Sequence, residues 1–391
     1  MDPIFSPPLY RQRQQFVIDF VKKTKPRKVI DLGCGECSLL KKLRFHREIE
    51  HLVGVDINGA KIKRKMHELA PVSTDYLQPS YDQLRVEMYQ GSVTQRDARL
   101  RGFDLVTSIE LIEHLTLADV EHFSAVVFGY MTPVTAIVST PNSEFNPLLP
   151  GLSGFRHSDH KFEWSRAEFR SWALRVCLEY GYEVEFTGVG QAPQDQQHSV
   201  GFCSQIGVFQ RLEGRDRFRA SLSDDEEDVF SYTLLYCINY PSLRDNNTLR
   251  RVVVSEVLYW AEHIKNKWME EKTGKKNDAF SLCQTEGGMD ELHFEPHMEM
   301  EEKQTGSKMT CVSVPLAVLW SFCPKIEELS GSLSNLRHLL MDEPGVKLSQ
   351  DGSSVLVKYQ EQDQEEEVED FEDSNYAECS HSAEQEEDWE V

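Results

Sequence analysis

The sequence predicts an α/β protein built on a doubly wound, mostly parallel sheet that binds a nucleotide-type cofactor. Three observations in residues 1–212 predict it: apolar strand patterns alternate with helical ones, a glycine pair follows the first strand, and the second strand ends in an acid, Asp56. Alternating strands and helices are typical of a sheet covered on both faces. Such a fold binds its ligand at the carboxyl ends of the strands.

The expected strands are short apolar runs bounded by turn residues or charges, as is typical of strands buried on both faces. The first run leads into the glycine turn, and the fifth ends at Thr140-Pro141-Asn142. In chain order, we expect strands at residues 28–32, 51–56, 86–91, 103–109, 134–139, 182–189 and 205–209.

Helices are expected before the first strand and between the later ones. Phe16, Val17, Phe20 and Val21 form one apolar stripe at helical spacing, which predicts a helix over residues 9–23. The helix after the glycine turn begins at Ser38. The full set of expected helices is 9–23, 38–43, 59–69 and 169–180.

The second half of the chain carries no recognisable chemistry, and we expect an α+β accessory region over residues 230–360. It begins after an acidic linker at 213–229. Within it we expect a half-exposed strand near 230–236, a helix with an apolar stripe at 249–264, disorder over 273–310, and a hairpin at 346–359 about Asp351-Gly352. Residues 361–391 are expected to be a disordered acidic tail.

Composition indicates a globular, intracellular chain. No apolar run approaches the ~18 residues of a membrane span, and the start of the chain has no signal-peptide pattern. The formal net charge of −23 does not exclude nucleic acid, because residues 361–391 contribute fifteen Asp and Glu and no Lys or Arg. Nine scattered cysteines do not form a disulfide framework, and Cys34-x-x-Cys37 has no second pair that would make a zinc site.

The glycine loop Asp31-Leu32-Gly33-Cys34-Gly35 is the expected cofactor site. Glycines let the backbone approach a ligand, and the following helix directs its N–H groups toward it. The third glycine of dinucleotide loops is absent, which favours S-adenosylmethionine over a pyrophosphate. A carboxylate at Asp56 can accept both ribose hydroxyls; a tight turn without ligand is the alternative. The expected cofactor residues are Asp31, Gly33, Gly35, Ser38, Asp56 and Ser92.

Glu110, Glu113 and His114 follow the fourth strand at helical spacing, so a helix there would project all three to one side. His160 lies in the long segment after the fifth strand, where function is common. Two carboxylates and two imidazoles suit a divalent ion such as Mg²⁺ or Mn²⁺, and also admit Co²⁺ or Zn²⁺. A solvated charged helix is the alternative for the triplet, and His157 is a competing ligand.

These residues carry a family resemblance. Asp31-Leu32-Gly33-Cys34-Gly35-Glu36, Glu110-x-x-Glu113-His114 and the segment from Arg156 to Trp164 resemble the Hua-enhancer type of small-RNA 2′-O-methyltransferases. The N-terminal Phe5-Ser6-Pro7-Pro8 resembles the FxPP segment of that family. The resemblance covers about residues 1–210 and implies a class I, Rossmann-like S-adenosylmethionine-dependent methyltransferase sheet with a C-terminal extension.

The resemblance also implies roles for residues. The metal ligands and catalytic residues of the family map onto Glu110, Glu113, His114 and His160, and its cofactor acid maps onto Asp56. Substrate contacts would fall to the expected RNA-binding residues Phe5, Pro7, Pro8, Arg156 and Lys161. A metal holding the 2′- and 3′-hydroxyls would select RNA 3′ ends. One of the histidines could also act as a general base, which the sequence leaves open.

No double-stranded-RNA-binding domain precedes the catalytic part. In this respect the chain resembles the animal branch of the family, whose substrates are single-stranded, PIWI-bound RNAs. The resemblance therefore implies piRNA 3′-end methylation in RNA-mediated gene silencing, a PIWI-type partner, and a cytoplasmic location that includes RNA granules. We expect a monomer that does not bind membranes. Two other functions stay open on the residues alone: a metal-dependent methyltransferase of small catechol-like diols, and a non-catalytic scaffold that keeps the cofactor fold.

Overall fold

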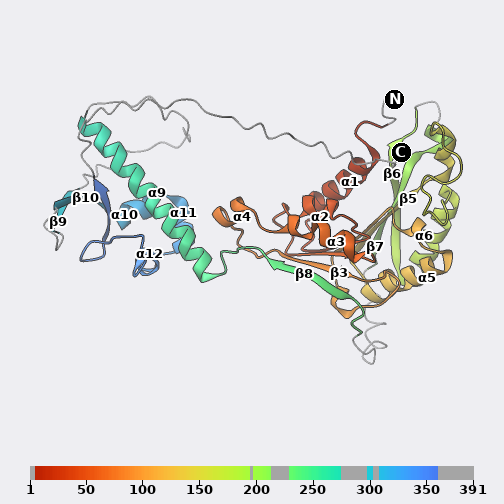
Figure 1. The fold of residues 1–391 in the computed structure, drawn as a ribbon, viewed down its shortest axis with the longest axis horizontal. Helices are drawn as coiled ribbons and strands as arrows, with labels where there is room; N and C mark the ends of the chain where they lie inside the picture. Colours follow the sequence, from red (N-terminus) through yellow and green to blue (C-terminus); the bar gives the residue numbers. More distant parts are fainter. Residues whose placement is uncertain (1–4, 194–196, 213–228, 274–296, 303–307, 360–391) are drawn as a thin grey trace. The chain divides into compact units, whose positions relative to one another are not determined.

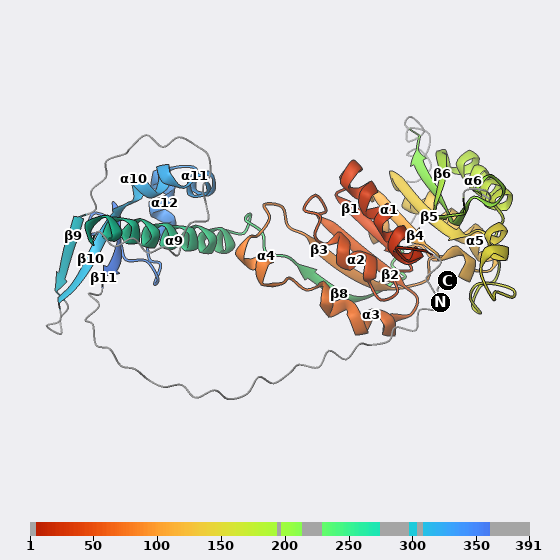
Figure 2. The ribbon, with the colours of Figure 1, turned by 90° about the horizontal axis from the view of Figure 1, so that it is seen from above.

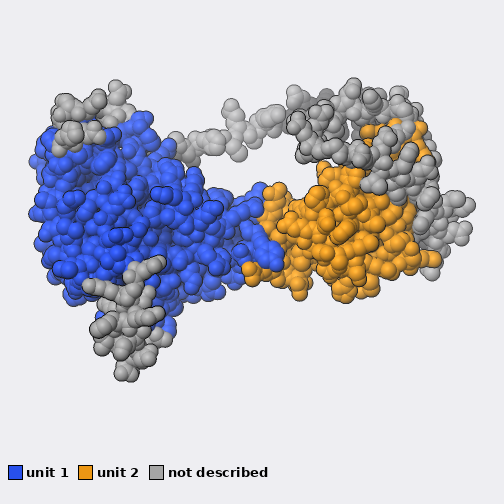
Figure 3. Space-filling model, turned by 180° about the vertical axis from the view of Figure 1, so that it is seen from behind, with its two compact units in different colours: residues 1–76, 80–241, 383–391 blue, residues 77–79, 242–382 orange. Residues whose placement is uncertain are grey.

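The computed structural model describes residues 5–193, 197–212, 229–273, 297–302 and 308–359, which fall into two compact units. Within these residues, unit 1 spans 5–241 except 77–79, and unit 2 contains 77–79 and everything from 242 onward (Figure 3). No helix in the described ranges is both long enough and apolar enough to cross a membrane. The expected linker at 213–228 and acidic tail at 361–391 lie outside the described residues.

Unit 1 is built on one eight-stranded sheet with the order β6-β7-β5-β4-β1-β2-β3-β8 (Figures 1 and 2). The five strands β1 to β5 pair in parallel, whereas β7, β6 and β8 pair antiparallel with their neighbours. The strands are β1 Lys28–Leu32, β2 His51–Asp56, β3 Arg85–Gln90, β4 Leu105–Ile109, β5 Thr135–Pro141, β6 Tyr182–Gln191, β7 Phe202–Arg211 and β8 Thr233–Asn239. This arrangement confirms the predicted doubly wound fold.

Helices cover both faces of this sheet, which explains why its central strands are almost continuously buried (Figure 1). One core joins the sheet to α1, α2 and α3, and the other joins it to α5, η4 and α6. The helical segments of unit 1 are α1 Leu9–Thr24, α2 Ser38–Leu43, α3 Gly59–Lys65, η1 Met66–Leu69, α4 Ser73–Leu77, η2 Ala98–Leu100, η3 Ile112–His114, α5 Leu117–Ser124, the π-helix η4 Ala125–Met131, η5 Ser143–Leu148, α6 Arg166–Tyr180 and α7 Gln197–Val200.

Helix α6 begins three residues earlier than its apolar pattern predicts, and its cap explains why. The Ser165 side chain accepts from the Glu168 backbone N–H while the Glu168 side chain accepts from Ser165, a reciprocal capping box. The helix ends at Gly181, which is left-handed with φ 79°. Capping thus sets both ends of the helix that follows the predicted site segment.

Strand β8 corrects the predicted division of the chain. The pattern of residues 230–236 predicts a strand of the accessory region, but β8 pairs with β3 and extends the sheet of unit 1. Just before it, the Tyr232 hydroxyl donates to the carbonyls of Ser92 and Gln95 at 2.7 and 3.1 Å. A Cβ on Gly91 would lie 2.2 Å from the Tyr232 ring, so a glycine is needed there. Alternation predicts a strand but does not identify its partner.

We expect Tyr232→Ala to destabilise unit 1 by about 3 kcal/mol, because it leaves a cavity over Gly91 and removes two hydrogen bonds. The measurement is urea unfolding followed by circular dichroism. Leu234→Ala is the matched control, since that side chain is 44 % exposed and should cost far less. Equal losses for the two variants would show that Tyr232 does not hold β8 in place.

Unit 2 packs four helices on a three-stranded antiparallel sheet, ordered β11-β10-β9. Its core includes Val253, Val257, Leu319 and Leu336. The elements are α9 Asn246–Thr273, β9 His297–Glu302, β10 Lys308–Pro315, α10 Leu316–Phe322, α11 Pro324–Ser330, α12 Leu333–Leu340 and β11 Ser354–Tyr359. The predicted stripe at 249–264 lies in α9, whose apolar face joins this core.

Two predictions for this region need correction. The disorder expected over 273–310 is wrong at its end, since 297–302 and 308–310 form strands; residues 274–296 and 303–307 lie outside the described residues. The expected hairpin at 346–359 is short: around the Asp351-Gly352 turn it has one bridge, Leu348 to Val355, and backbone hydrogen bonds from Ser349 to Ser354 and from Leu356 to Lys347. The main partner of β11 is instead β10, which buries the apolar side chains of β11 against the helices.

Candidate functional site

The parallel strands β1, β2, β4 and β5 end at one edge of the sheet, where the predicted site residues gather. The glycine loop follows β1, Asp56 ends β2, the Glu110–His114 segment follows β4, and Asn142 follows β5. In sheets of this kind, ligands bind at this edge.

The glycine loop has the backbone that glycine permits. Gly33 and Gly35 lie at φ 76° and 51°, in the left-handed region. The N–H groups of Gly33 and Cys34 bond to the carbonyl of Val55, which fixes the loop to β2. A Cβ on Gly33 would lie 2.8 Å from the Leu111 side chain, so the loop also packs against the segment that carries Glu110 and Glu113.

Two acids flank this loop in different environments. Asp56 is half-buried and accepts from the N–H groups of Gly35 at 2.9 Å and Asn58 at 2.7 Å. Asp31 is buried and accepts from the Thr107 hydroxyl at 2.7 Å. Burial is the main cause that raises the pKa of Asp31 to about 7, and the nearby Asp56 charge adds to it.

The remaining predicted cofactor residues lie at the same edge. The Ser38 hydroxyl accepts from the Gln14 amide at 2.8 Å, and the Ser92 hydroxyl contacts that of Thr94 at 2.8 Å. Ile57, directly after Asp56, is 71 % exposed. An exposed apolar side chain at this position can pack against the face of a planar ring of a ligand. Ile57 was not among the predicted site residues, although its place directly after the strand-ending acid Asp56 was the available signal.

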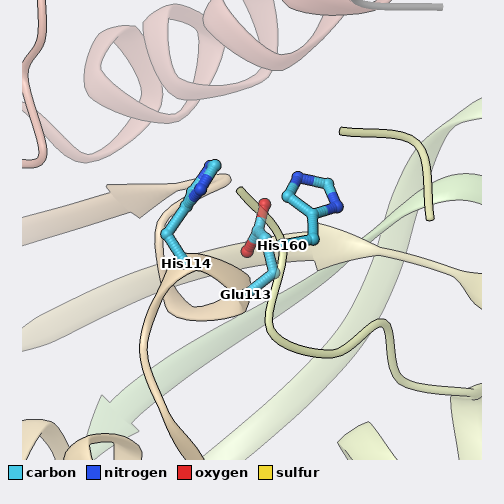
Figure 4. Close-up of side chains that lie close together, drawn as sticks. All are labelled: Glu113, His114 and His160. Atoms are coloured by element: carbon cyan, nitrogen blue, oxygen red, sulfur yellow. The ribbon is translucent and has the colours of Figure 1, made fainter. Parts of the chain in front are cut away.

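A second group lies beside the loop. Glu113, His114 and His160 bring potential ligand atoms within 4.8 Å of one another (Figure 4). The Glu113 carboxylate lies between the two imidazoles in this view, and the rings of His114 and His160 are 4.9 Å apart between centroids. Glu113 and His114 come from η3, whereas His160 comes from the segment between η5 and α6.

The environment of Glu113 fits a bound cation. One carboxylate oxygen accepts from the Thr140 hydroxyl at 3.0 Å, while the other is fully buried without a hydrogen-bond partner. Burial and then the nearby Glu110 carboxylate raise the pKa of Glu113 well above its usual value. An unpaired buried carboxylate is costly, and a metal ion would compensate its charge. A carboxylate with two imidazoles is a suitable donor set for a divalent ion.

His160 is held by a residue whose role the sequence analysis missed. Its Nδ1 lies 2.6 Å from Oε1 of Glu163, and both side chains are almost fully buried. Burial disfavours the Glu163 carboxylate, but hydrogen bonds from His160, Asn146 and Arg156 outweigh it and hold the pKa of Glu163 below its usual value. A carboxylate at one ring nitrogen orients a histidine to use the other. The i, i+3 spacing of His160 and Glu163 was the available signal.

Glu110 is not part of the close group, which corrects the predicted helix. Its φ of 50° is left-handed, so no regular helix can run from Glu110 to His114, and η3 begins only at Ile112. Its carboxylate accepts from the hydroxyls of Ser139 and Ser204 at 2.8 and 2.7 Å, and lies 3.4 Å from the Arg13 guanidinium. The pKa of His114 is lowered mainly by burial and by His160, with an opposing contribution from Glu110.

The competing ligand His157 lies near the group but outside it. Its ring centroid is 5.9 Å from that of His114 and 5.7 Å from that of His160. The side chain is exposed, and its Nδ1 accepts from the Asp159 backbone N–H at 3.1 Å. The geometry therefore favours His160 over His157 as the inward-facing histidine.

Of the residues expected to contact substrate, Arg156 differs most from expectation. Its guanidinium donates to Asn146, Cys203 and the Asn142 carbonyl, so most of its N–H donors are used within the protein. Lys161 is exposed, and its backbone N–H bonds to the Glu113 carbonyl at 2.8 Å.

The N-terminal segment also lies in unit 1, near the strands' carboxyl edge. Phe5 packs on Phe145 of η5 with ring centroids 5.8 Å apart. Pro7 is exposed and Pro8 half-buried, directly before α1. Cys34 and Cys37 are buried free thiols within the loop, and the hydrogen bond with Cys37, followed by burial, raises the pKa of Cys34 well above its usual value.

Comparisons with known families agree with the two units. A family model for a methyltransferase domain matches residues 30–133, inside unit 1. A second model, described as the HENMT1 C-terminal domain, matches residues 247–359, inside unit 2. The accessory region thus has relatives of its own, which the sequence analysis did not recognise.

Two relatives and one solved structure are named as small RNA methyltransferases. The chain is 43 % identical over 361 residues to a small RNA 2′-O-methyltransferase of Xenopus tropicalis, covering 90 % of this chain and 96 % of that protein. Identity to the protein of that name from Mus musculus is 42 % over 366 residues, with 90 % of each covered. A crystal structure of the small RNA methyltransferase HEN1 superposes with a TM-score of 0.50 at 31 % identity, over 61 % of this chain and 28 % of that one.

Proposed function

The chain belongs to the small RNA 2′-O-methyltransferase family, and from this premise we propose that it methylates the 2′-oxygen at the 3′ end of a small single-stranded RNA. The methyl donor is S-adenosylmethionine, bound along the glycine loop, and the reaction depends on a divalent metal. The RNA is a piRNA-like product carried by a PIWI-type protein in the cytoplasm.

One observation carries the metal part of this proposal. Glu113 has a buried oxygen without a partner, a carboxylate oxygen of Glu113 lies within 4.8 Å of a ring nitrogen of each of two imidazoles, and the group sits at the edge of the sheet where the glycine loop ends. Glu113, His114 and His160 would hold the ion, with Glu110 as a fourth ligand once its carboxylate leaves Arg13. A bound divalent ion would lower the pKa of a hydroxyl attached to it and fix its orientation.

The protein groups themselves supply position and charge. Glu163 orients His160, Thr140 orients Glu113, and Leu111 packs the glycine loop against this segment. Only an RNA 3′ end offers neighbouring 2′- and 3′-hydroxyls, so a site that takes both oxygens would reject a 3′-phosphate or a 2′-methylated end. We assign binding of the cofactor to Asp31, Gly33, Gly35, Ser38, Asp56 and Ser92.

Methyl transfer from labelled S-adenosylmethionine to matched RNAs tests the function. An RNA with a 2′,3′-diol end should be labelled, whereas RNAs of the same sequence with a 2′-deoxy or 3′-phosphate end should not. Labelling of the 2′-deoxy RNA would place the methyl group elsewhere and overturn the proposal. Labelling of a catechol in place of RNA would favour a small-diol methyltransferase.

For the cofactor site we expect Asp56→Ala to weaken S-adenosylmethionine binding by about 1.5–3 kcal/mol, because the carboxylate can accept charge-assisted bonds from ribose hydroxyls. Isothermal titration calorimetry with the cofactor alone measures this. Asp104→Ala is the control: that carboxylate caps the backbone N–H groups of Arg27 and Lys28 at the opposite end of β1. Unchanged affinity in Asp56→Ala would refute the assignment.

For the metal site we expect Glu163→Gln to reduce Mn²⁺ affinity by about 10- to 100-fold, as is usual when the partner of a liganding histidine is removed. The change keeps the size of the side chain but removes the negative charge beside His160. Calorimetric titration with Mn²⁺ reads the effect without any turnover. Asn146→Ala, which removes the bond to the other Glu163 oxygen, should weaken metal binding less. Equal Mn²⁺ affinity in wild type and Glu163→Gln would refute this role.

A further inference from the structure

A cavity of about 720 Å³ opens in unit 1 beside the site. It lies between α6 and the strands β6 and β7. Its walls include the aromatic rings of Phe186 and Phe202, the guanidinium groups of Arg166 and Arg170, and the amide of Gln205. A cavity of this size is large enough for a nucleotide.

The two arginines of this cavity differ in whether a carboxylate neutralises their charge. Arg166 pairs with Glu144, with Nε 2.7 Å and Nη2 2.6 Å from the same carboxylate oxygen. Arg170 stacks on Phe186, with its guanidinium carbon 4.5 Å from the ring centroid. In the described part of the chain, Arg170 has no carboxylate partner, and its side chain is exposed. The cavity therefore holds one uncompensated, pre-oriented cation on an aromatic surface.

The cavity opens at the same edge of the sheet as the group formed by Glu113, His114 and His160. β6 runs in the same direction as β5, so residues Phe186 onward and the start of β7 lie at the carboxyl ends of the parallel strands. The Gln205 amide donates to the carbonyls of Pro141 and Trp164. Those carbonyls belong to the segments that carry Thr140, the partner of Glu113, and His160. The Gln205 side chain thus links the cavity lining to the two segments that carry Thr140 and His160.

From this geometry we propose that the cavity binds a nucleotide of the RNA upstream of the 3′-terminal one. Its base stacks on the aromatic wall with Phe202, and its phosphate pairs with Arg170. Aromatic faces combined with arginine are the typical platform for single-stranded nucleic acid, and they accept any base because every base has a π-face. The inference rests on the proposed RNA substrate and assigns it a second point of attachment.

The stacked arginine favours RNA over an acidic peptide as the occupant. An acidic peptide would gain from the charge of Arg170 but leave the aromatic wall with little to bind, whereas a nucleotide uses both. A bound nucleotide here would hold the chain on the enzyme while its last ribose reaches Glu113 and His160. It follows that affinity should depend on RNA length beyond the reacting end.

Fluorescence anisotropy of labelled RNAs tests the proposal in the full-length protein. We expect Phe202→Leu to raise the Kd for a long single-stranded RNA by roughly 5- to 100-fold, the range for loss of one stacked base, and Arg170→Gln to raise it through loss of the phosphate contact. In Arg170→Gln, the slope of log Kobs against log salt should become shallower by about 0.7, the value for one phosphate contact on a single strand. The preference for long RNA over a 3′-terminal mononucleoside should shrink in both variants.

Arg175→Gln is the matched control, because Arg175 lies on the same helix and pairs with Glu121 at 3.2 Å outside the cavity. Unchanged RNA affinity in Arg170→Gln and Phe202→Leu, with circular dichroism confirming the fold, would overturn the proposal. The proposal would also be overturned if these two variants lost affinity for an acidic peptide but kept their affinity for RNA. If wild type itself neither bound nor methylated RNA, the proposed function would fail first, which separates the two outcomes.

Discussion

Glu113→Gln, His114→Ala and His160→Ala are each expected to lower methyl transfer by about a hundredfold or more while leaving cofactor affinity nearly unchanged. A metal-supported step loses several kcal/mol of stabilisation when a ligand is removed. The proposed cofactor contacts lie on a different loop, so cofactor binding should survive. Transfer rates with saturating RNA and calorimetry with the cofactor give the two readouts. Mn²⁺ titration should show weakened metal binding in all three variants.

His157→Ala provides the control for this series. Its ring is exposed and lies outside the close group, so the variant should retain most of the activity. A loss in His157→Ala as large as that in His160→Ala would mean that the wrong histidine has been assigned. Full activity of the wild type in a strong chelator would refute the metal mechanism itself.

Asp31→Asn is expected to make the protein more stable above pH 7 and to bind S-adenosylmethionine more weakly. The pKa of Asp31 is raised to about 7 by burial, whereas it is near 3.9 in an unfolded chain. Between these values the folded protein keeps a proton that the unfolded chain has lost. Folding stability therefore falls as pH rises from about 4 to about 7, by on the order of 4 kcal/mol from this group. Asparagine removes that dependence.

Urea unfolding at pH 5 and pH 8 checks the expectation. The loss of stability between the two pH values should be smaller in Asp31→Asn than in wild type, and Glu121→Gln, an exposed charge change, should behave like wild type. Cofactor affinity should fall, because S-adenosylmethionine carries a positive sulfonium that a carboxylate attracts. Identical pH dependence in Asp31→Asn and wild type would show that Asp31 titrates normally.

The central sheet could be predicted from sequence because burial on both faces leaves a clear apolar run for each parallel strand. β1 and β2 match the predicted bounds, and the predicted glycine loop lies between β1 and α2. β8 could be predicted only as a strand, since its pairing with β3 depends on a long-range contact. Side-chain alternation does not encode which edge a strand will join.

In the candidate site, too, local sequence patterns were predictive, whereas long-range contacts were not visible in the sequence. Glu113, His114 and His160 could be named from motifs, because short spacings and position at strand ends are visible in the chain. The left-handed backbone of Glu110 could not be anticipated, since non-glycine residues rarely adopt it. The engagement of Arg156 with backbone carbonyls was also hidden, because its charge alone suggested an RNA contact. Tertiary contacts determine both the backbone conformation of Glu110 and the hydrogen bonds of Arg156.

The position of β8 has a consequence for how the protein is made and handled. Translation must pass residue 239 before the sheet of unit 1 can be completed, so the nascent chain presents β3 as an unpaired edge until then. A recombinant fragment ending at 212 would keep that edge unpaired permanently, and Tyr232 would no longer cover Gly91. Open strands of this kind recruit other chains. Fragments meant for crystallography or assay should therefore extend through Pro241.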